Sequence, residues 1–179
     1  MEPNSKTAVL VIDVQNDVVA AAYQRDEVVA NIDAVIERAR AANVPVVWIQ
    51  HDDDGLAVDT EGWQIVPELE PQANEPVINK NFRSSFDATT LEATLDELDV
   101  GRLIITGSQT DFCVRWTLHG ALDRGYDTVL VADAHTTDAV SPADMPQGAE
   151  LIAHTNSTWG SQATKRAETA VVPTADLVF

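Results

Sequence analysis

Three side chains that can act together in nucleophilic catalysis stand far apart in this sequence of 179 residues: Asp13, Lys80 and Cys113. Cys113 is the only cysteine, and its thiolate would be the nucleophilic form. A nearby ammonium favours the thiolate, and a carboxylate can accept the thiol proton. The three residue types therefore correspond to the parts of a catalytic triad: a nucleophile, a cation and a proton acceptor.

Each of these residues also has a purely structural interpretation. A lone cysteine is commonly a small buried hydrophobe. Asp13 could cap the segment after it, and Lys80 could be a solvated lysine at a strand end. Position separates the two interpretations, because all three residues follow or end apolar runs that predict strands. In a parallel α/β sheet, ligands bind beyond the carboxyl ends of the strands, so the pattern favours a working site.

Six short apolar runs predict buried strands, at 7–14, 44–50, 76–80, 102–107, 128–133 and 169–173. Apolar residues at helical spacing predict helices between them, at 24–43, 88–99, 112–124 and 147–154. This alternation predicts an α/β fold in which helices cover both faces of a parallel sheet, within one domain over residues 1–179. The long acidic stretch 51–75 is expected to be a functional loop.

The helix after residue 107 is expected to activate the cysteine. Thr110 or Asp111 could cap this helix, which would place Cys113 in its first turn. Unpaired backbone N–H groups at a helix start lower the pKa of a thiol, and a nearby lysine lowers it further.

Composition excludes several classes of partner. A net charge of −18 and a pI of about 4.2 argue against nucleic acid and against an anionic membrane, because both would be repelled. One cysteine excludes an internal disulfide framework and fits a reducing compartment. The first residues, MEPNSKTAV, lack the features of a signal peptide, and no apolar run approaches the ~20 residues of a membrane span. We expect a soluble, cytoplasmic protein with a small-molecule substrate.

Three motifs resemble those of the isochorismatase-like cysteine hydrolases: IDVQND around Asp13, VINKNFRSSF around Lys80 and ITGSQTDFCV leading to Cys113. The resemblance implies a Rossmann-like three-layer α/β/α sandwich with a mostly parallel sheet of about six strands. It also implies that these three residues form the catalytic triad. A cis peptide between Ser108 and Gln109 would direct the backbone amides of Gln109 and Cys113 into an oxyanion hole.

The resemblance further implies covalent hydrolysis of a small amide, imide or carbamoyl compound. Asp13 would take the thiol proton, Lys80 would support the thiolate, and Cys113 would attack the carbonyl carbon to form a thioester that water cleaves. No cofactor is expected. Members of the family are often dimers or larger homo-oligomers, and the C-terminal apolar residues (171–172 and 177–179) could pack on a partner.

Two departures from the family pattern bear on the substrate. Nicotinamidases of this superfamily bind a metal through an Asp-x-His pair, whereas here His51 and Asp53 occupy the two positions in exchanged order. We therefore predict no catalytic metal and do not expect nicotinamide as the substrate. Val18 and Val19 stand where a phenylalanine is common, so the pocket wall is expected to be less aromatic there.

Five further residues are candidates for substrate binding, and each also has a structural interpretation as core, interface or surface. Arg83 could contact a substrate carboxylate, and Gln15 could position or polarise the substrate. The other three are the aromatic residues Trp63, Phe82 and Phe112.

Two other functions remain open at this stage. One is vinyl-ether hydrolysis of the isochorismatase type, which as the family is understood does not use a cysteine nucleophile. The other is a non-catalytic binding module or a thiol redox sensor, although a sensor would need a thiol from outside the chain.

Overall fold

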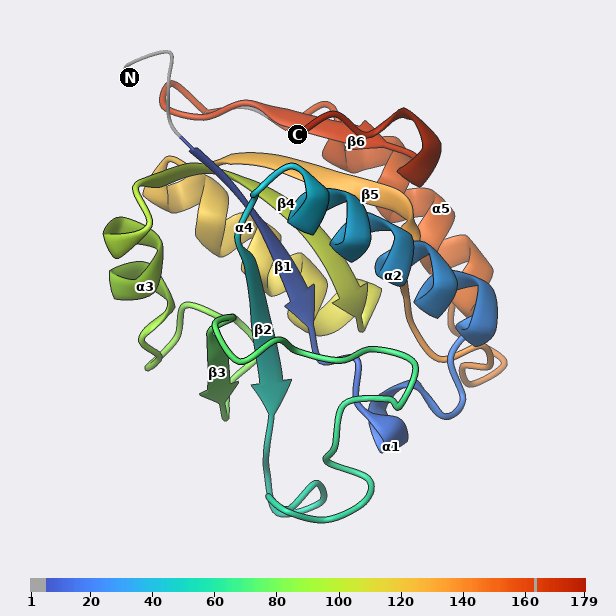
Figure 1. Ribbon diagram of the computed structural model, residues 1–179. Coiled ribbons are helices and arrows are strands. Elements are labelled where there is room, and N and C mark those ends of the chain that lie inside the picture. The colour runs from blue at the N-terminus through green and yellow to red at the C-terminus, as the bar shows by residue number, and fades with distance from the viewer. Residues whose placement is uncertain (1–5, 163) are drawn as a thin grey trace.

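In the part of the chain that the structure describes, six strands form one parallel sheet in the order β3-β2-β1-β4-β5-β6 (Figure 1). The computed structural model describes residues 6–162 and 164–179. Residues 1–5, which belong to the segment expected not to be a signal peptide, lie outside this description. The strands are β1 Lys6–Ile12, β2 Val46–His51, β3 Val77–Lys80, β4 Val100–Ser108, β5 Asp127–Thr136 and β6 Thr169–Val172.

Helices lie between successive strands of the chain, except between β2 and β3. They are α1 Asn16–Val19, α2 Arg25–Ala41, α3 Leu91–Glu97, α4 Arg115–Arg124 and α5 Gly148–Trp159, with a π-helical turn η1 at Thr110–Val114 and a 3-10 turn η2 at Thr174–Asp176. The expected α/β class and all ten predicted elements are confirmed, with ends that differ by a few residues.

The sheet is buried on both faces, which explains why its strands read as continuous apolar runs. Along β1, Leu10 and Ile12 belong to one core cluster and Val9 and Val11 to the other. The first cluster includes apolar residues of α3, α4 and α5, and the second includes the apolar face of α2. Figure 1 shows α2 in front of the sheet and α4 behind it. The three-layer sandwich is therefore confirmed.

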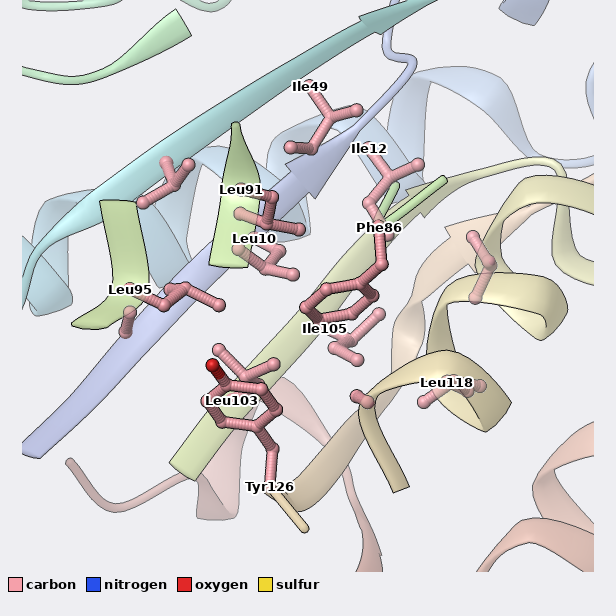
Figure 2. Packing of buried hydrophobic residues seen from close by; sticks show 14 of the residues in the cluster. Leu10, Ile12, Ile49, Phe86, Leu91, Leu95, Leu103, Ile105, Leu118 and Tyr126 are labelled. Atoms are coloured by element: carbon pink, nitrogen blue, oxygen red, sulfur yellow. The ribbon is translucent and has the colours of Figure 1, made fainter. Parts of the chain in front are cut away.

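The core beneath α3 and α4 holds the strands that carry the site. Figure 2 shows side chains of β1 and β4 packed against those of α3 and α4, with Phe86 and Tyr126 between them. The rings of Phe86 and Tyr126 stack at 5.8 Å between centroids. Burying each large apolar side chain stabilises the fold by about 1.5–3 kcal/mol, so this packing holds the strands that carry the site in place.

Three short elements carry no periodic signal and were not predicted: α1, η1 and η2. Helix α5 also continues to Trp159, beyond the predicted end at residue 154. Its start is fixed by a capping box in which Gln147 and Glu150 bond each other's backbone N–H groups. The second half of α5 is polar, so apolar spacing alone could not find its end.

The C-terminal apolar residues pack mainly within their own chain. Leu177 is buried, and Val171, Val172 and Phe179 lie against the core. Only Val178 is largely exposed, at 72%. Most of these residues therefore contact the core of their own chain, and the expectation that they also pack on a partner stays a prediction. Among the described residues, no helix has the length and apolar character needed to cross a membrane.

Candidate active site

Four polar side chains lie at the carboxyl ends of four neighbouring strands. Lys80 ends β3, His51 ends β2, Asp13 follows β1, and Cys113 lies in the turn after β4. Because the strand order is β3-β2-β1-β4, residues up to 100 positions apart in sequence become neighbours. His51 and Lys80 are direct partners in the register of β2 and β3.

The three predicted catalytic side chains are in contact. Lys80 Nζ lies 2.7 Å from Asp13 Oδ2 and 3.3 Å from Cys113 Sγ. Exposure of the residues is 1% for Lys80, 1% for Asp13 and 6% for Cys113. An ion pair withdrawn from water in this way is costly unless its partners are held close together. The structure thus brings together the three residues that the sequence pointed to.

Two unusual backbone conformations make this approach possible. Asp13 adopts a left-handed conformation with φ of +49°, and its N–H donates to Ile49 O at 3.0 Å. Gly107 has φ of +114°, and a Cβ there would lie 2.0 Å from Ile12 O. Only glycine lets β4 pass this close to the end of β1, and this close approach sets the separation between Asp13 and Cys113.

The turn that carries the nucleophile differs from a simple helix start. The Ser108–Gln109 peptide bond is cis, as the resemblance implied. The chain then makes a π-helical turn, in which Val114 N–H donates to Gln109 O at 3.1 Å. Such wide turns are rare and occur frequently at functional sites, and no sequence signal revealed this one.

The expected capping of this turn is wrong. Thr110 Oγ1 bonds His135 Nδ1 at 2.8 Å, and Asp111 Oδ1 accepts from Thr137 Oγ1 at 2.7 Å. Both side chains therefore tie the turn to the end of β5 instead of to its own N–H groups. The Gln109 N–H finds no acceptor among the described residues, which keeps it free for the predicted oxyanion hole.

Burial dominates the electrostatics of the site. Burial raises the pKa of Asp13 above its ordinary value, and the neighbouring Lys80 ammonium opposes this shift. Burial, with the Asp13 charge added, raises the pKa of the Cys113 thiol to about 11, again opposed by Lys80. The expected lowering of the thiol pKa is therefore wrong. Cys113 rests as a thiol, beside a carboxylate that is more basic than a free one.

A cavity of about 350 Å³ opens onto these residues. Its lining comes from the strand ends, α1 and the loop after β2: Asp13, Asp17, Val18, His51, Asp53, Gly55, Leu56, Arg83, Gln109, Cys113 and Asp138. Val18 forms part of the wall, in line with the expected lack of an aromatic residue there. The cavity is of the size that holds a small organic substrate.

Among the five predicted substrate-binding residues, Arg83 alone lines this cavity. Its guanidinium lies 4.5 Å from the centre of the Phe112 ring, so Phe112 supports Arg83 from outside the cavity. Phe82 is 53% exposed, and its backbone oxygen accepts from Lys80 Nζ at 3.2 Å. The Trp63 side chain lies outside the cavity lining as well.

The expectation for Gln15 is wrong, because its amide is fully engaged within the protein. Gln15 Nε2 donates to His51 O at 2.9 Å and to Trp63 O at 2.7 Å, and Oε1 accepts from His51 N–H at 2.8 Å. The side chain is fully buried. Gln15 therefore clamps the end of β2 to the loop that follows it and leaves no polar atom for a substrate.

Sequence reasoning missed four polar residues of the lining: Asp17, His51, Asp53 and Asp138. His51 and Asp53 were noted for their exchanged order, and the position of His51 at a strand end was an available signal. Asp17 is the last residue of the first motif. Asp138 lies after β5, in a region without a recognisable pattern.

His51 contacts another side chain through each of its ring nitrogens. His51 Nδ1 lies 3.3 Å from Lys80 Nζ, and Nε2 lies 3.2 Å from Asp53 Oδ2. Both ring nitrogens are thus directed at protein groups. Within residues 6–162 and 164–179, no three His, Cys, Asp or Glu side chains gather in a way that could hold a metal ion.

Comparison with known proteins places this site in a family. The family model of the isochorismatase domain matches residues 7–163. The chain is 33% identical to a streptothricin hydrolase of Streptomyces noursei over 96% of its own length and 63% of that protein, so it spans less than two thirds of this relative. It is 26% identical to a ureidoacrylate amidohydrolase of Serratia proteamaculans, over 94% of this chain and 84% of that one.

A solved structure described as an isochorismatase from Pseudomonas putida KT2440 has the same fold. It superposes with a TM-score of 0.86 at 28% identity, over 97% of this chain and 91% of that one. The sheet, the motifs around the three contacting side chains and the match over most of the sequence all indicate the same family. The chain belongs to the isochorismatase family.

Proposed function

We propose that this protein hydrolyses a C–N bond in a small amide, imide or carbamoyl compound through a thioester on Cys113. The observation that carries the proposal is the contact of the sole thiol with a buried ion pair at a cavity of about 350 Å³. A nucleophile, a base and a cation are then within reach of one small substrate.

The first step transfers the thiol proton and forms the C–S bond. Asp13 is the base, because its carboxylate faces the thiol and its pKa is raised. A raised pKa makes the Asp13 carboxylate a stronger base than a free aspartate, which favours transfer of the thiol proton to it. As the proton leaves, Lys80 stabilises the charge on sulfur from 3.3 Å. Sulfur then attacks the carbonyl carbon.

The second step releases the amine and restores the thiol. The oxyanion accepts hydrogen bonds from the backbone N–H groups of Gln109 and Cys113. Asp13 returns the proton to the leaving ammonia or amine as the C–N bond breaks. Asp13 then takes a proton from a water molecule, whose oxygen attacks the thioester carbon. The C–S bond breaks, a carboxylic or carbamic acid leaves, and Asp13 returns the proton to the Cys113 sulfur. Every proton transfer uses groups of the chain, and the mechanism needs no metal or cofactor.

The names of the relatives agree with this reaction class, since one of them is an amidohydrolase. Asp17, Asp53, Asp138 and Arg83 line the cavity, and these charged groups would select among amides.

The test is a panel of small amides, imides and carbamoyl compounds, followed by released ammonia or amine. We expect Cys113→Ser and Cys113→Ala to lower turnover by at least about 10³-fold while the unfolding transition persists. Rapid quenching of the wild-type protein should trap an acyl adduct on Cys113, visible by intact-protein mass. Undiminished amide hydrolysis in the Cys113 variants would refute the nucleophile. Turnover of isochorismate that survives loss of the thiol would favour vinyl-ether hydrolysis instead.

A further inference from the structure

The buried carboxylate of Asp13 lacks hydrogen-bond donors. Lys80 Nζ lies 2.7 Å from Asp13 Oδ2, but its three N–H groups serve other acceptors: Phe82 O at 3.2 Å, Cys113 Sγ at 3.3 Å and His51 Nδ1 at 3.3 Å. Neither oxygen of Asp13 receives a hydrogen bond from the residues that the structure describes. Asp13 is 1% exposed and lines the cavity of about 350 Å³. Buried polar groups are almost always hydrogen-bonded, so this end of the cavity suits a ligand that brings N–H donors.

The lining of the same cavity holds more carboxylates than cations. Asp17 belongs to α1, Asp53 follows β2 and Asp138 follows β5. Arg83 is the one lysine or arginine among the described lining residues. In the described part of the chain, no lysine or arginine forms an ion pair with these three aspartates. With histidine and the buried ion pair counted as neutral, the cavity therefore carries two negative charges in excess.

Asp17 and Asp138 lie on adjoining segments. Asp138 pairs with Ala22 in an isolated antiparallel bridge, three residues beyond the end of α1. Asp17 N–H donates to Gly62 O at 3.0 Å, and a Cβ at position 62 would lie 1.9 Å from Asp17 Oδ2. Gly62 thus leaves the space in which the Asp17 carboxylate lies. Asp138 Oδ1 accepts from Gln109 Nε2 at 3.0 Å, and its second oxygen remains an acceptor for a ligand.

Asp53 and Arg83 are more strongly engaged within the protein. Asp53 Oδ1 accepts from Gly55 N–H at 2.8 Å, and Oδ2 lies 3.2 Å from His51 Nε2. The Arg83 guanidinium lies 4.5 Å from the centre of the Phe112 ring in a cation–π contact. The two carboxylates on the adjoining segments are therefore the ones with most acceptor capacity for a ligand.

We propose that the substrate is a small amide that carries a positively charged amino group, and that this group binds to the carboxylates of Asp17 and Asp138. The proposal rests on the proposed function for the reaction and adds the charge of the substrate. An ammonium brings three N–H donors, which match carboxylate oxygens in charge and in hydrogen bonding. The amide end then lies at Cys113, which lines the same cavity. A substrate with a negative charge would be repelled by this lining.

The charge preference of the cavity can be measured without a substrate, because Cys113 is the only cysteine. Three methanethiosulfonates of similar size serve as probes: 2-aminoethyl (cationic), 2-hydroxyethyl (neutral) and 2-sulfonatoethyl (anionic). Each forms a mixed disulfide with the Cys113 thiolate and releases methanesulfinate. The rate of a charged probe divided by that of the neutral probe is therefore independent of how much thiolate is present. At pH 7 and low salt, we expect this ratio to be at least about 10 for the cation and below about 0.1 for the anion. Intact-protein mass follows the reaction, and Cys113→Ser is the blank.

Variants separate the cavity from the net charge of −18 on the whole chain. Asp17→Asn and Asp138→Asn keep the shape of the side chain and should each lower the cation ratio about threefold. The double variant should bring the ratio close to that in about 0.5 M salt, where charges are screened. Asp123→Asn is the matched control, because Asp123 is exposed near the end of α4 and precedes the start of β5, at the opposite end of the sheet. It removes the same charge and should change the ratio by less than about 1.5-fold.

Turnover of matched amides tests the same preference in the reaction. 4-Aminobutanamide and pentanamide have the same chain length and differ by an ammonium in place of a methyl group. We expect kcat/KM to be at least about tenfold higher for 4-aminobutanamide, mainly through KM, because the ammonium binds away from the reacting carbonyl. Asp138→Asn should remove most of this difference and leave kcat/KM for pentanamide within about twofold.

Two results would overturn the proposal. One is a cation ratio that falls no further in Asp17→Asn and Asp138→Asn than in Asp123→Asn, since the preference would then come from the whole chain. The other is faster hydrolysis of pentanamide than of 4-aminobutanamide. If no amide is hydrolysed, the proposed function fails, and the probe ratios still decide whether the cavity selects a cation.

Discussion

Replacing Lys80 by methionine would test how strongly the buried ion pair shapes this protein. Methionine keeps most of the length and volume of lysine and removes its charge. Asp13, at 1% exposure, would then lose the ammonium 2.7 Å away that favours its charged form. We expect Asp13 to take up a proton in the folded variant, because burial already raises its pKa in the presence of Lys80.

The free energy needed to protonate Asp13 at pH 7 sets how much stability the variant loses. A free aspartate has a pKa of 3.8, and pH 7 lies about 3.2 units above it, at about 1.36 kcal/mol per unit. The free energy of unfolding of the variant at pH 7 is therefore lowered by up to about 4 kcal/mol, similar to the ~3–5 kcal/mol measured when a buried pair loses one partner. A raised folded pKa means that stability is fully present below pH 3.8 and lost as pH rises. The loss should accordingly shrink toward pH 4.

Urea unfolding at pH 7, 5.5 and 4 measures this dependence. Lys165→Met is the matched control, since Lys165 is exposed. The double variant Asp13→Asn, Lys80→Met removes the ionisable carboxyl, so it should be more stable than Lys80→Met at pH 7 and show no such pH dependence. A loss in Lys80→Met that is the same at all three pH values, or a double variant no more stable than the single one, would refute the reasoning.

Three further predictions follow from burial and backbone geometry. Folding raises the pKa of the Cys113 thiol from 9.0 to about 11, so up to about 3 kcal/mol of stability that is present below pH 9 is lost between pH 9 and 11. Urea midpoints should show this loss in the wild type and not in Cys113→Ala, and equal losses in the two proteins would contradict the prediction. Burial lowers the pKa of His135, so the stability that neutral His135 contributes is present above pH 6.5 and is lost as pH falls through the folded pKa. Acid unfolding of His135→Gln should lack this loss of stability, and an acid transition unchanged from the wild type would rule out the prediction. Gly107→Ala should lower the free energy of unfolding by more than about 3 kcal/mol, because its Cβ would lie 2.0 Å from Ile12 O at a φ of +114°. Gly125→Ala should lower it by about 1–2 kcal/mol, because its Cβ would lie 3.6 Å from the nearest atom at a φ of +91°. Similar shifts in melting temperature for the two variants would show that steric overlap is not the main cause.

The site could be located from sequence because its parts sit at strand ends. Apolar runs such as 7–14 and 102–107 need no tertiary information to indicate strands, and parallel topology brings their carboxyl ends to one edge. Asp13, Lys80 and Cys113 each end or follow such a run. Their convergence was therefore a consequence of the fold class, which the alternation of strands and helices already indicated.

The lining of the cavity could not be located in this way. Gln15 lies in the first motif, two residues from Asp13, yet it is buried and bonded to His51 and Trp63. Whether a polar side chain faces a cavity or the protein depends on which distant backbone groups meet it. Those groups come from a long loop without periodicity, so sequence spacing carries no information about them.

The sequence by itself determined the α/β class, the six parallel strands and the three residues of the candidate triad, because hydrophobic periodicity and strand ends are local properties of the chain. Only the tertiary structure decided the protonation of Cys113, the π-helical turn around it and the contact of His51 with Lys80. These properties depend on exclusion of water and on contacts between groups from separate strands, and both arise only when the chain is folded.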